Sequence, residues 1–248
     1  MDKIQYIYGI ADNALILGQR LGELCGHGPN LETDIAMTNI ALDLLGQTRS
    51  YYQYAAKLTG ENATEDTIAF LRNEREYKNV LLVEQPNTDF AYSIVRQFLF
   101  DNYHLLLLTE LQNSKDETLV AIAKKSIKEV SYHKRFSSDW IRRLGDGTEE
   151  SHNKMQTAIN DLWTYTDELF HQTDADKIMA EQGIGVDVTK LKEIYYNQIN
   201  EILAESTLKT PDMKYFQKGG KQGIHSEHMG YLLADLQYMQ RTFPNMNW

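Results

Sequence analysis

Residues 88–112 read TDFAYSIVRQFLFDNYHLLLLTELQ, and this stretch decides the fold class. Its apolar residues recur every three or four positions, which is the pattern of an amphipathic helix. The apolar face carries Ile94, Phe98, Leu105 and Leu108, and Asp101 lies on the same face. Burying a carboxylate is costly unless it is paired or binds a metal ion. The stretch therefore predicts a long core helix with an acid that needs a partner.

The segment after this helix predicts what it packs against. Residues 114–117, Ser-Lys-Asp-Glu, have the pattern of a capping box, in which the serine and the glutamate satisfy free amides at a helix start. We expect a helix from there to Leu144 that forms an antiparallel hairpin with the first. Counting back from the fold places Asp101 level with Ser131, within one turn of His133. Asp101 and His133 are therefore predicted to meet in the core, directly or through one water.

Helical periodicity extends over nearly the whole chain, and strand patterns are nearly absent. Two more long helices are predicted at residues 4–25 and 31–58, and shorter ones at residues 64–74, 148–170, 188–206 and 226–241. Four long helices joined by short breaks give an all-α antiparallel four-helix bundle, with the remaining helices packed outside it. Because no linker or internal repeat interrupts the pattern, we expect a single domain over residues 1–248.

Composition restricts the class of function. The 248 residues carry a formal net charge of −10, which argues against nucleic acid and anionic membranes as main partners. The one cysteine, Cys25, cannot form an internal disulfide, which suits a reducing compartment. The first residues show no signal-peptide pattern, and the longest apolar run, Leu105 to Leu108, is too short to cross a bilayer. These features predict a cytoplasmic globular protein.

The bundle level of Asp101 holds the candidate site. The first hairpin folds near Gly28 and places Asp12 level with Leu44, and Gln47 follows three residues later on the same helix face. One level of the bundle is then ringed by Asp12, Leu44, Gln47, Asp101, Val130 and His133. A carboxylate-bridged di-iron site takes a carboxylate from each of two helices. Each of the other two helices contributes a glutamate and a histidine at i and i+3.

Three of these six residues do not supply the ligand that such a site needs. Leu44 and Val130 have no donor atom, and the amide oxygen of Gln47 is a poor substitute for imidazole. We therefore expect the helical frame of a di-iron site without a working metal site. Spacing alone leaves a second interpretation equally open, in which Asp101 and His133 are a buried pair in an ordinary helical core.

Five stretches, in order along nearly the whole chain, carry a family resemblance: LGELCGHGPNLE (21–32), NIALDLLGQTR (39–49), NVLLVEQPN (79–87), AKKSIKEVSYH (123–133) and GGKQGIHSEH (219–228). Together they resemble the PaaC family, the C subunits of the multicomponent phenylacetyl-CoA oxygenase, also called ring 1,2-epoxidase. The resemblance favours the degenerate di-iron frame over the ordinary buried pair.

This resemblance implies a ferritin-like fold and a structural, non-catalytic subunit of a monooxygenase complex. The complex would form the aromatic-ring 1,2-epoxide in aerobic phenylacetate catabolism. The partners implied are the catalytic A subunit, a homologue that keeps the di-iron centre, and the other subunits, with a flavin and iron–sulfur reductase. This chain itself would bind no cofactor and no metal. Within the family pattern, Glu23 matches the first ligand position as well as Asp12 does.

Two other functions compete with that of a structural subunit. The first is a di-iron oxygenase active in its own right with an altered ligand set, and the second is a ferritin-like storage or binding module. Both need ligands that Leu44, Gln47 and Val130 do not provide. The ligand count therefore argues against both.

Other polar residues give weaker indications of a binding or metal site. Lys218 and Lys221 lie in a basic, glycine-rich segment that could receive CoA phosphates or an acidic partner, or could be a solvated loop. For His225 and His228, helix capping or partner contact is favoured over metal binding. Two Glu-x-x-His strings, at 149–152 and 168–171, are interpreted as solvent-facing.

A partner surface is expected on the helices predicted at residues 31–58 and 88–112. These helices carry aromatic residues on more than one face, namely Tyr51, Tyr52, Phe98 and Tyr103. Tyrosine is a residue favoured at protein interfaces. Without the partner, the same surface would form a homodimer.

Overall fold

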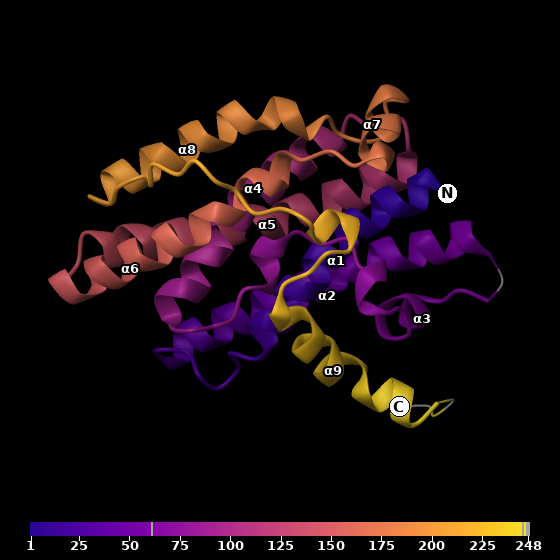
Figure 1. The fold of residues 1–248 in the computed structure, drawn as a ribbon, viewed down its shortest axis with the longest axis horizontal. Coiled ribbons are helices and arrows are strands. Elements are labelled where there is room, and N and C mark those ends of the chain that lie inside the picture. Colours follow the sequence, from indigo (N-terminus) through magenta and orange to yellow (C-terminus); the bar gives the residue numbers. More distant parts are fainter. Residues whose placement is uncertain (61, 245, 247–248) are drawn as a thin grey trace.

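The computed structural model describes residues 1–60, 62–244 and 246. Four long helices form its centre: α1 (Asp2–Gly22), α2 (Leu31–Thr59), α4 (Phe90–Leu111) and α5 (Glu117–Gly145). α1 packs against α2 and α4 against α5, and contacts between α2 and α5 join the two hairpins (Figure 1). Over the described residues the structure contains helices and no strand, so the prediction of an all-α, ferritin-like bundle is confirmed.

Side-chain caps fix where the long helices begin. The Asn30 side chain accepts a hydrogen bond from the amide of Thr33 at 2.9 Å, and Asp89 caps α4 in the same way. At the start of α5 the capping prediction was wrong, because Asp116 rather than Ser114 accepts from the first free amides, at 3.1 Å. Ser114 instead donates to the carbonyl of Ile184 at 2.6 Å, and so ties the hairpin turn to a distant loop.

Shorter helices surround the bundle: α3 (Glu65–Phe70), α6 (Glu149–Leu162), α7 (Asp174–Glu181), α8 (Lys192–Glu205) and α9 (Glu227–Thr242). Short 3-10 turns lie at Glu74–Glu76, Leu81–Glu84, Trp163–Tyr165, Asp167–Phe170, Val188–Leu191 and Gly220–Gln222. The helix predicted at residues 148–170 therefore ends at Leu162 and continues as two 3-10 turns. α7 was not predicted, because its eight residues give too little periodicity to detect.

The peripheral helices cover the bundle unevenly. α6 and α8 lie along the α4–α5 hairpin, and α7 packs against α1. α9 contacts α3 and α1 and points away from the rest of the molecule toward the C-terminus (Figure 1). No described helix is long and apolar enough to cross a membrane.

The aromatic residues expected at a partner surface lie in the core instead. Tyr51, Tyr52, Phe98 and Tyr103 are at most 3% exposed, which corrects that part of the interface prediction. Their rings pack in the hydrophobic core and contribute to the buried apolar area that stabilises the bundle.

Candidate functional site

At the level where a metal site was expected, α2 and α5 are joined by two polar contacts. The imidazole of His133 donates from Nε2 to the Asp43 carboxylate at 3.0 Å, and the Gln47 amide donates to Glu129 at 2.9 Å. Asp43 and Gln47 are four residues apart on α2, and Glu129 and His133 are four residues apart on α5. Both contacts therefore lie on one face of each helix. Asp43 and Glu129 were not among the predicted site residues, and the i, i+4 spacing of Glu129 to His133 does not match the ligand pattern of a di-iron site.

The Asp101 carboxylate has other partners than predicted. It accepts hydrogen bonds from Gln97 at 2.6 Å and from the Ser137 hydroxyl at 2.8 Å, whereas His133 turns to Asp43. The predicted direct contact between Asp101 and His133 was wrong. Burial raises the pKa of Asp101 to about 8, although the two hydrogen bonds act in the opposite direction. At neutral pH this acid is therefore mainly protonated and needs no positive partner.

A second imidazole, His104 on α4, lies in the core near His133 and was not predicted from the sequence. Burial lowers the pKa of His104 to about 3, with a smaller contribution from His133. Burial lowers the pKa of His133 as well, against the raising effect of Asp43. Within the described part of the chain, neither Nδ1 atom has a hydrogen-bond partner. Both rings are thus neutral at physiological pH.

Asp12 is fully buried and belongs to a different network. The Arg72 guanidinium donates to both of its oxygens, at 2.6 and 3.0 Å, and the backbone amide of Lys78 donates at 2.7 Å. The Tyr52 hydroxyl also donates to the carboxylate. Arg72 is packed over the ring of Tyr77 with 4.1 Å to the centroid. The lone pairs that a metal would need are therefore already used by donors.

The remaining positions of the expected ring also lack free ligands. Leu44 and Val130 are fully buried apolar side chains. The alternative acid, Glu23, is exposed at the end of α1 and accepts from Arg20 at 2.9 and 3.0 Å. Within residues 1–60, 62–244 and 246, no group of three or more His, Cys, Asp or Glu residues could hold a metal ion. The residues present do not fit a di-iron centre.

The two Glu-x-x-His strings differ from each other in the structure. Glu149 is exposed, as expected, and His152 contacts the carbonyl of Gly145 at 2.7 Å. Glu168 is only 1% exposed, so its assignment to solvent was wrong. It accepts hydrogen bonds from the amides of Leu81 and Gly219, both at 2.7 Å. Glu168 thus fixes the glycine-rich segment to the body of the protein.

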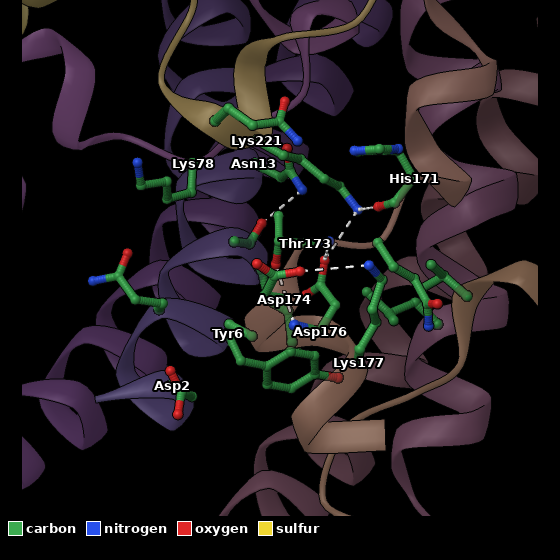
Figure 2. A pocket seen from close by; sticks show the side chains of 18 of the residues that line it. Asp2, Tyr6, Asn13, Lys78, His171, Thr173, Asp174, Asp176, Lys177 and Lys221 are labelled. Atoms are coloured by element: carbon green, nitrogen blue, oxygen red, sulfur yellow. Dashed lines mark hydrogen bonds and ion pairs between the residues drawn. The ribbon is translucent and has the colours of Figure 1, made fainter. Parts of the chain in front are cut away.

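The two lysines of the glycine-rich segment differ in their exposure to solvent. Lys218 is exposed, whereas Lys221 is buried and donates to the carbonyl of His171 at 2.7 Å. The expectation of a solvated loop is therefore corrected for Lys221, whereas a contact of Lys218 or Lys221 with CoA phosphates or an acidic partner stays a prediction. Figure 2 shows its ammonium group pointing between His171 and Asp176 in the wall of a pocket.

His225 and His228 take different positions at the start of α9. His225 forms a buried pair with Glu84 at 2.6 Å, and its pKa is raised because this carboxylate outweighs the opposing effect of burial. Ser226 donates twice to the same carboxylate, from its amide and its hydroxyl. His228 remains partly exposed in the first turn of α9. The pair His225–Glu84 therefore anchors α9 to the 3-10 turn at Leu81–Glu84.

The chain is similar to known proteins over its whole length. The family described as phenylacetic acid catabolic protein matches the chain over residues 1–248. The C subunit of the 1,2-phenylacetyl-CoA epoxidase of Escherichia coli (strain K12) is 49% identical over 243 residues, which cover 98% of this chain and 98% of that protein.

Proposed function

Because this chain belongs to the family of phenylacetic acid catabolic proteins, we propose that it is the C subunit of a 1,2-phenylacetyl-CoA epoxidase and acts there as a structural, non-catalytic subunit. The observation that carries the proposal is the 49% identity over 98% of both chains to such a subunit. At this identity and coverage the two chains share their whole architecture rather than one motif.

The chemistry at the bundle centre supports a non-catalytic role. Oxygen activation at a di-iron centre needs open coordination positions and several free carboxylate and imidazole ligands. Here Asp12 is saturated by Arg72, Asp101 is mainly protonated, and Leu44 offers no donor. We propose that the di-iron centre belongs to a catalytic A subunit, and that flavin and iron–sulfur groups belong to a reductase in the same cytoplasmic complex.

A surface on α2 supports a role in assembly. Leu31, Ile35, Leu42 and Leu45 are 70, 51, 60 and 36% exposed. Their spacing of four, seven and three residues places them in one stripe, which is the pattern of a helix that packs against another helix. We call these four residues the α2 stripe.

Gly46 adjoins the α2 stripe in the middle of the helix. It is exposed, and a Cβ placed there would meet nothing within 4 Å. A glycine inside a helix costs about 1 kcal/mol relative to alanine, so its presence needs a reason. The packing within this chain gives none, whereas the close approach of a neighbouring subunit would.

Co-expression with the catalytic subunit tests the proposed function. We expect the two chains to purify as one complex, and epoxidation of phenylacetyl-CoA by the reconstituted system to require both. A catalytic subunit that is stable, soluble and fully active without this chain would contradict the proposal. So would failure of the two wild-type chains to associate.

A further inference from the structure

A cavity of about 510 Å³ lies between α1, residues 171–177 and the turn at Gly220–Gln222 (Figure 2). Its volume is in the range of small-molecule sites, which usually combine apolar walls with a few well-placed polar groups. The apolar part of the wall consists of Tyr6, Ile10, Tyr103, Leu107 and Val188. The polar part includes Lys221, which contributes a buried ammonium group.

Lys221 has hydrogen-bonding capacity to spare. Its side chain is 8% exposed, and Nζ donates to the carbonyl of His171 at 2.7 Å. The nearest carboxylate oxygen in an ion pair with it, on Asp176, is 3.8 Å away, beyond hydrogen-bond distance. An ammonium has three N–H donors, so two are left for acceptor atoms in the cavity.

The backbone around Lys221 is held in place. Glu168 accepts from the amides of Gly219 and Leu81 at 2.7 Å, and so joins the turn to the body of the protein. A Cβ at Gly220 would overlap the carbonyl of Asn79, so only glycine allows this close approach. A polar group that is fixed before a ligand arrives loses little conformational freedom on binding. Lys221 is therefore preorganised to face the cavity.

The charges around the cavity select the kind of anion. Lys78, Lys177 and Lys221 line it together with Asp2, Asp174 and Asp176, so the two signs balance. Asp174 already pairs with Lys177 at 3.4 Å. A phosphate dianion placed on Lys221 would meet the carboxylate of Asp176, whereas a single negative charge would meet less repulsion.

We propose that this cavity binds a small monocarboxylate with an aromatic or aliphatic body, with its carboxylate on Nζ of Lys221 and its body against Tyr6, Ile10 and Tyr103. Aromatic side chains such as Tyr6 and Tyr103 contribute large contact areas and favourable ring geometry to such a body. The lowering of the Lys221 pKa by burial is consistent with a site that a bound anion would stabilise. Binding at this cavity does not depend on the proposed function.

A ligand-observed NMR titration of the purified full-length chain tests this inference. The probes are benzoate and hexanoate, and the matched controls are benzyl alcohol without the charge, acetate without the body, and phenyl phosphate with a second charge. We expect saturable binding of at least one probe, and at least tenfold weaker binding of each control. No saturable binding of either probe, or phenyl phosphate binding as tightly as the probes, would overturn the proposal.

Two variants, with a third as the control, test whether the ligand binds in this cavity. Lys221→Met should weaken probe binding at least tenfold, whereas Lys218→Met, a surface change in the same segment, should leave it unchanged. Gly9→Leu covers the case in which Lys221→Met does not fold, because Gly9 lines the cavity on α1 and a Cβ there meets nothing within 4 Å. Leucine also favours the helix over glycine. Unchanged probe binding by folded Gly9→Leu would place the ligand elsewhere and refute the site.

Discussion

Asp101 carries a proton inside the bundle, and this proton couples stability to pH. Burial raises its pKa from 3.8 to about 8 in the folded protein, so between these values the folded state binds a proton that the unfolded state has released. Stability therefore falls as pH rises through this window, by at most about 1.4 kcal/mol per pH unit.

Asp101→Asn removes this titration and keeps the shape of the neutral acid. Urea unfolding at pH 5 and pH 8 should show that the wild type loses more stability than the variant over this interval. The variant should be the more stable of the two at pH 8. Parallel pH dependences for the two proteins would show that Asp101 is ionised in the folded state.

A second prediction for a single residue concerns the buried pair Asp12–Arg72. Arg72→Met leaves a buried carboxylate without its counter-charge, and should lower the free energy of unfolding by about 3–5 kcal/mol. The matched control is Arg49→Met. Arg49 pairs with Glu65 on the surface and its side chain is 71% exposed, so the loss should stay below about 1 kcal/mol. Equal losses in chemical denaturation would mean that the Asp12 network contributes nothing beyond a surface pair.

Among the elements, α2 presents the clearest surface for assembly. Ile35→Glu combined with Leu42→Glu places two charges on the α2 stripe, at two of its side chains that are more than half exposed. Since both side chains are exposed, the variant should fold as the wild type does. Its retention by a co-expressed, affinity-tagged catalytic subunit should fall at least tenfold.

Leu58→Glu is the control on the same helix. Leu58 is 41% exposed but lies outside the α2 stripe, so its change should leave retention intact. If the stripe variant is retained as well as the wild type while the wild-type complex still forms, the interface lies elsewhere and the proposed function stands.

The boundaries of the long helices α2 and α4 followed from the sequence, but the rotation of the helices about their axes and the register between them did not. The ends predicted for α2 and α4 from apolar periodicity lie within two residues of the observed ends. The periodic apolar residues define each helix, because another placement would leave the apolar stripe exposed. Counting along the hairpin put Asp101 beside His133, one helical turn from its actual partner Ser137. A count assumes straight, symmetric helices, and it does not fix which neighbour a side chain faces. His133 therefore reached α2 rather than α4.

Loop contacts could not be predicted from the sequence for a related reason. Glu168 lies at the end of the helix predicted at residues 148–170 and Lys221 in a glycine-rich segment, so a solvated position was the natural expectation for both charged residues. Their burial depends on hydrogen bonds to backbone groups far away in the sequence, such as the amide of Leu81. No local pattern encodes such contacts.

At the scale of the whole molecule, charge favours a different partner over a second copy. The chain has a formal net charge of −10, so a homodimer would bring two strongly acidic surfaces together. A less acidic subunit at the α2 stripe avoids this repulsion and still covers the apolar surface. The homodimer expected for the isolated chain should consequently be the weaker assembly, and raised salt should strengthen it.

Iron content and turnover, measured on the same preparations, test the central claim most directly. The purified chain, alone and in complex with its catalytic subunit, is analysed for iron after growth with iron in excess. It is then assayed with phenylacetyl-CoA, reductase and oxygen. We expect iron far below one atom per chain and no epoxide from the isolated chain, with iron and turnover appearing together in the complex. Stoichiometric iron in the isolated chain, or epoxide formation by it, would contradict the claim that this subunit is structural.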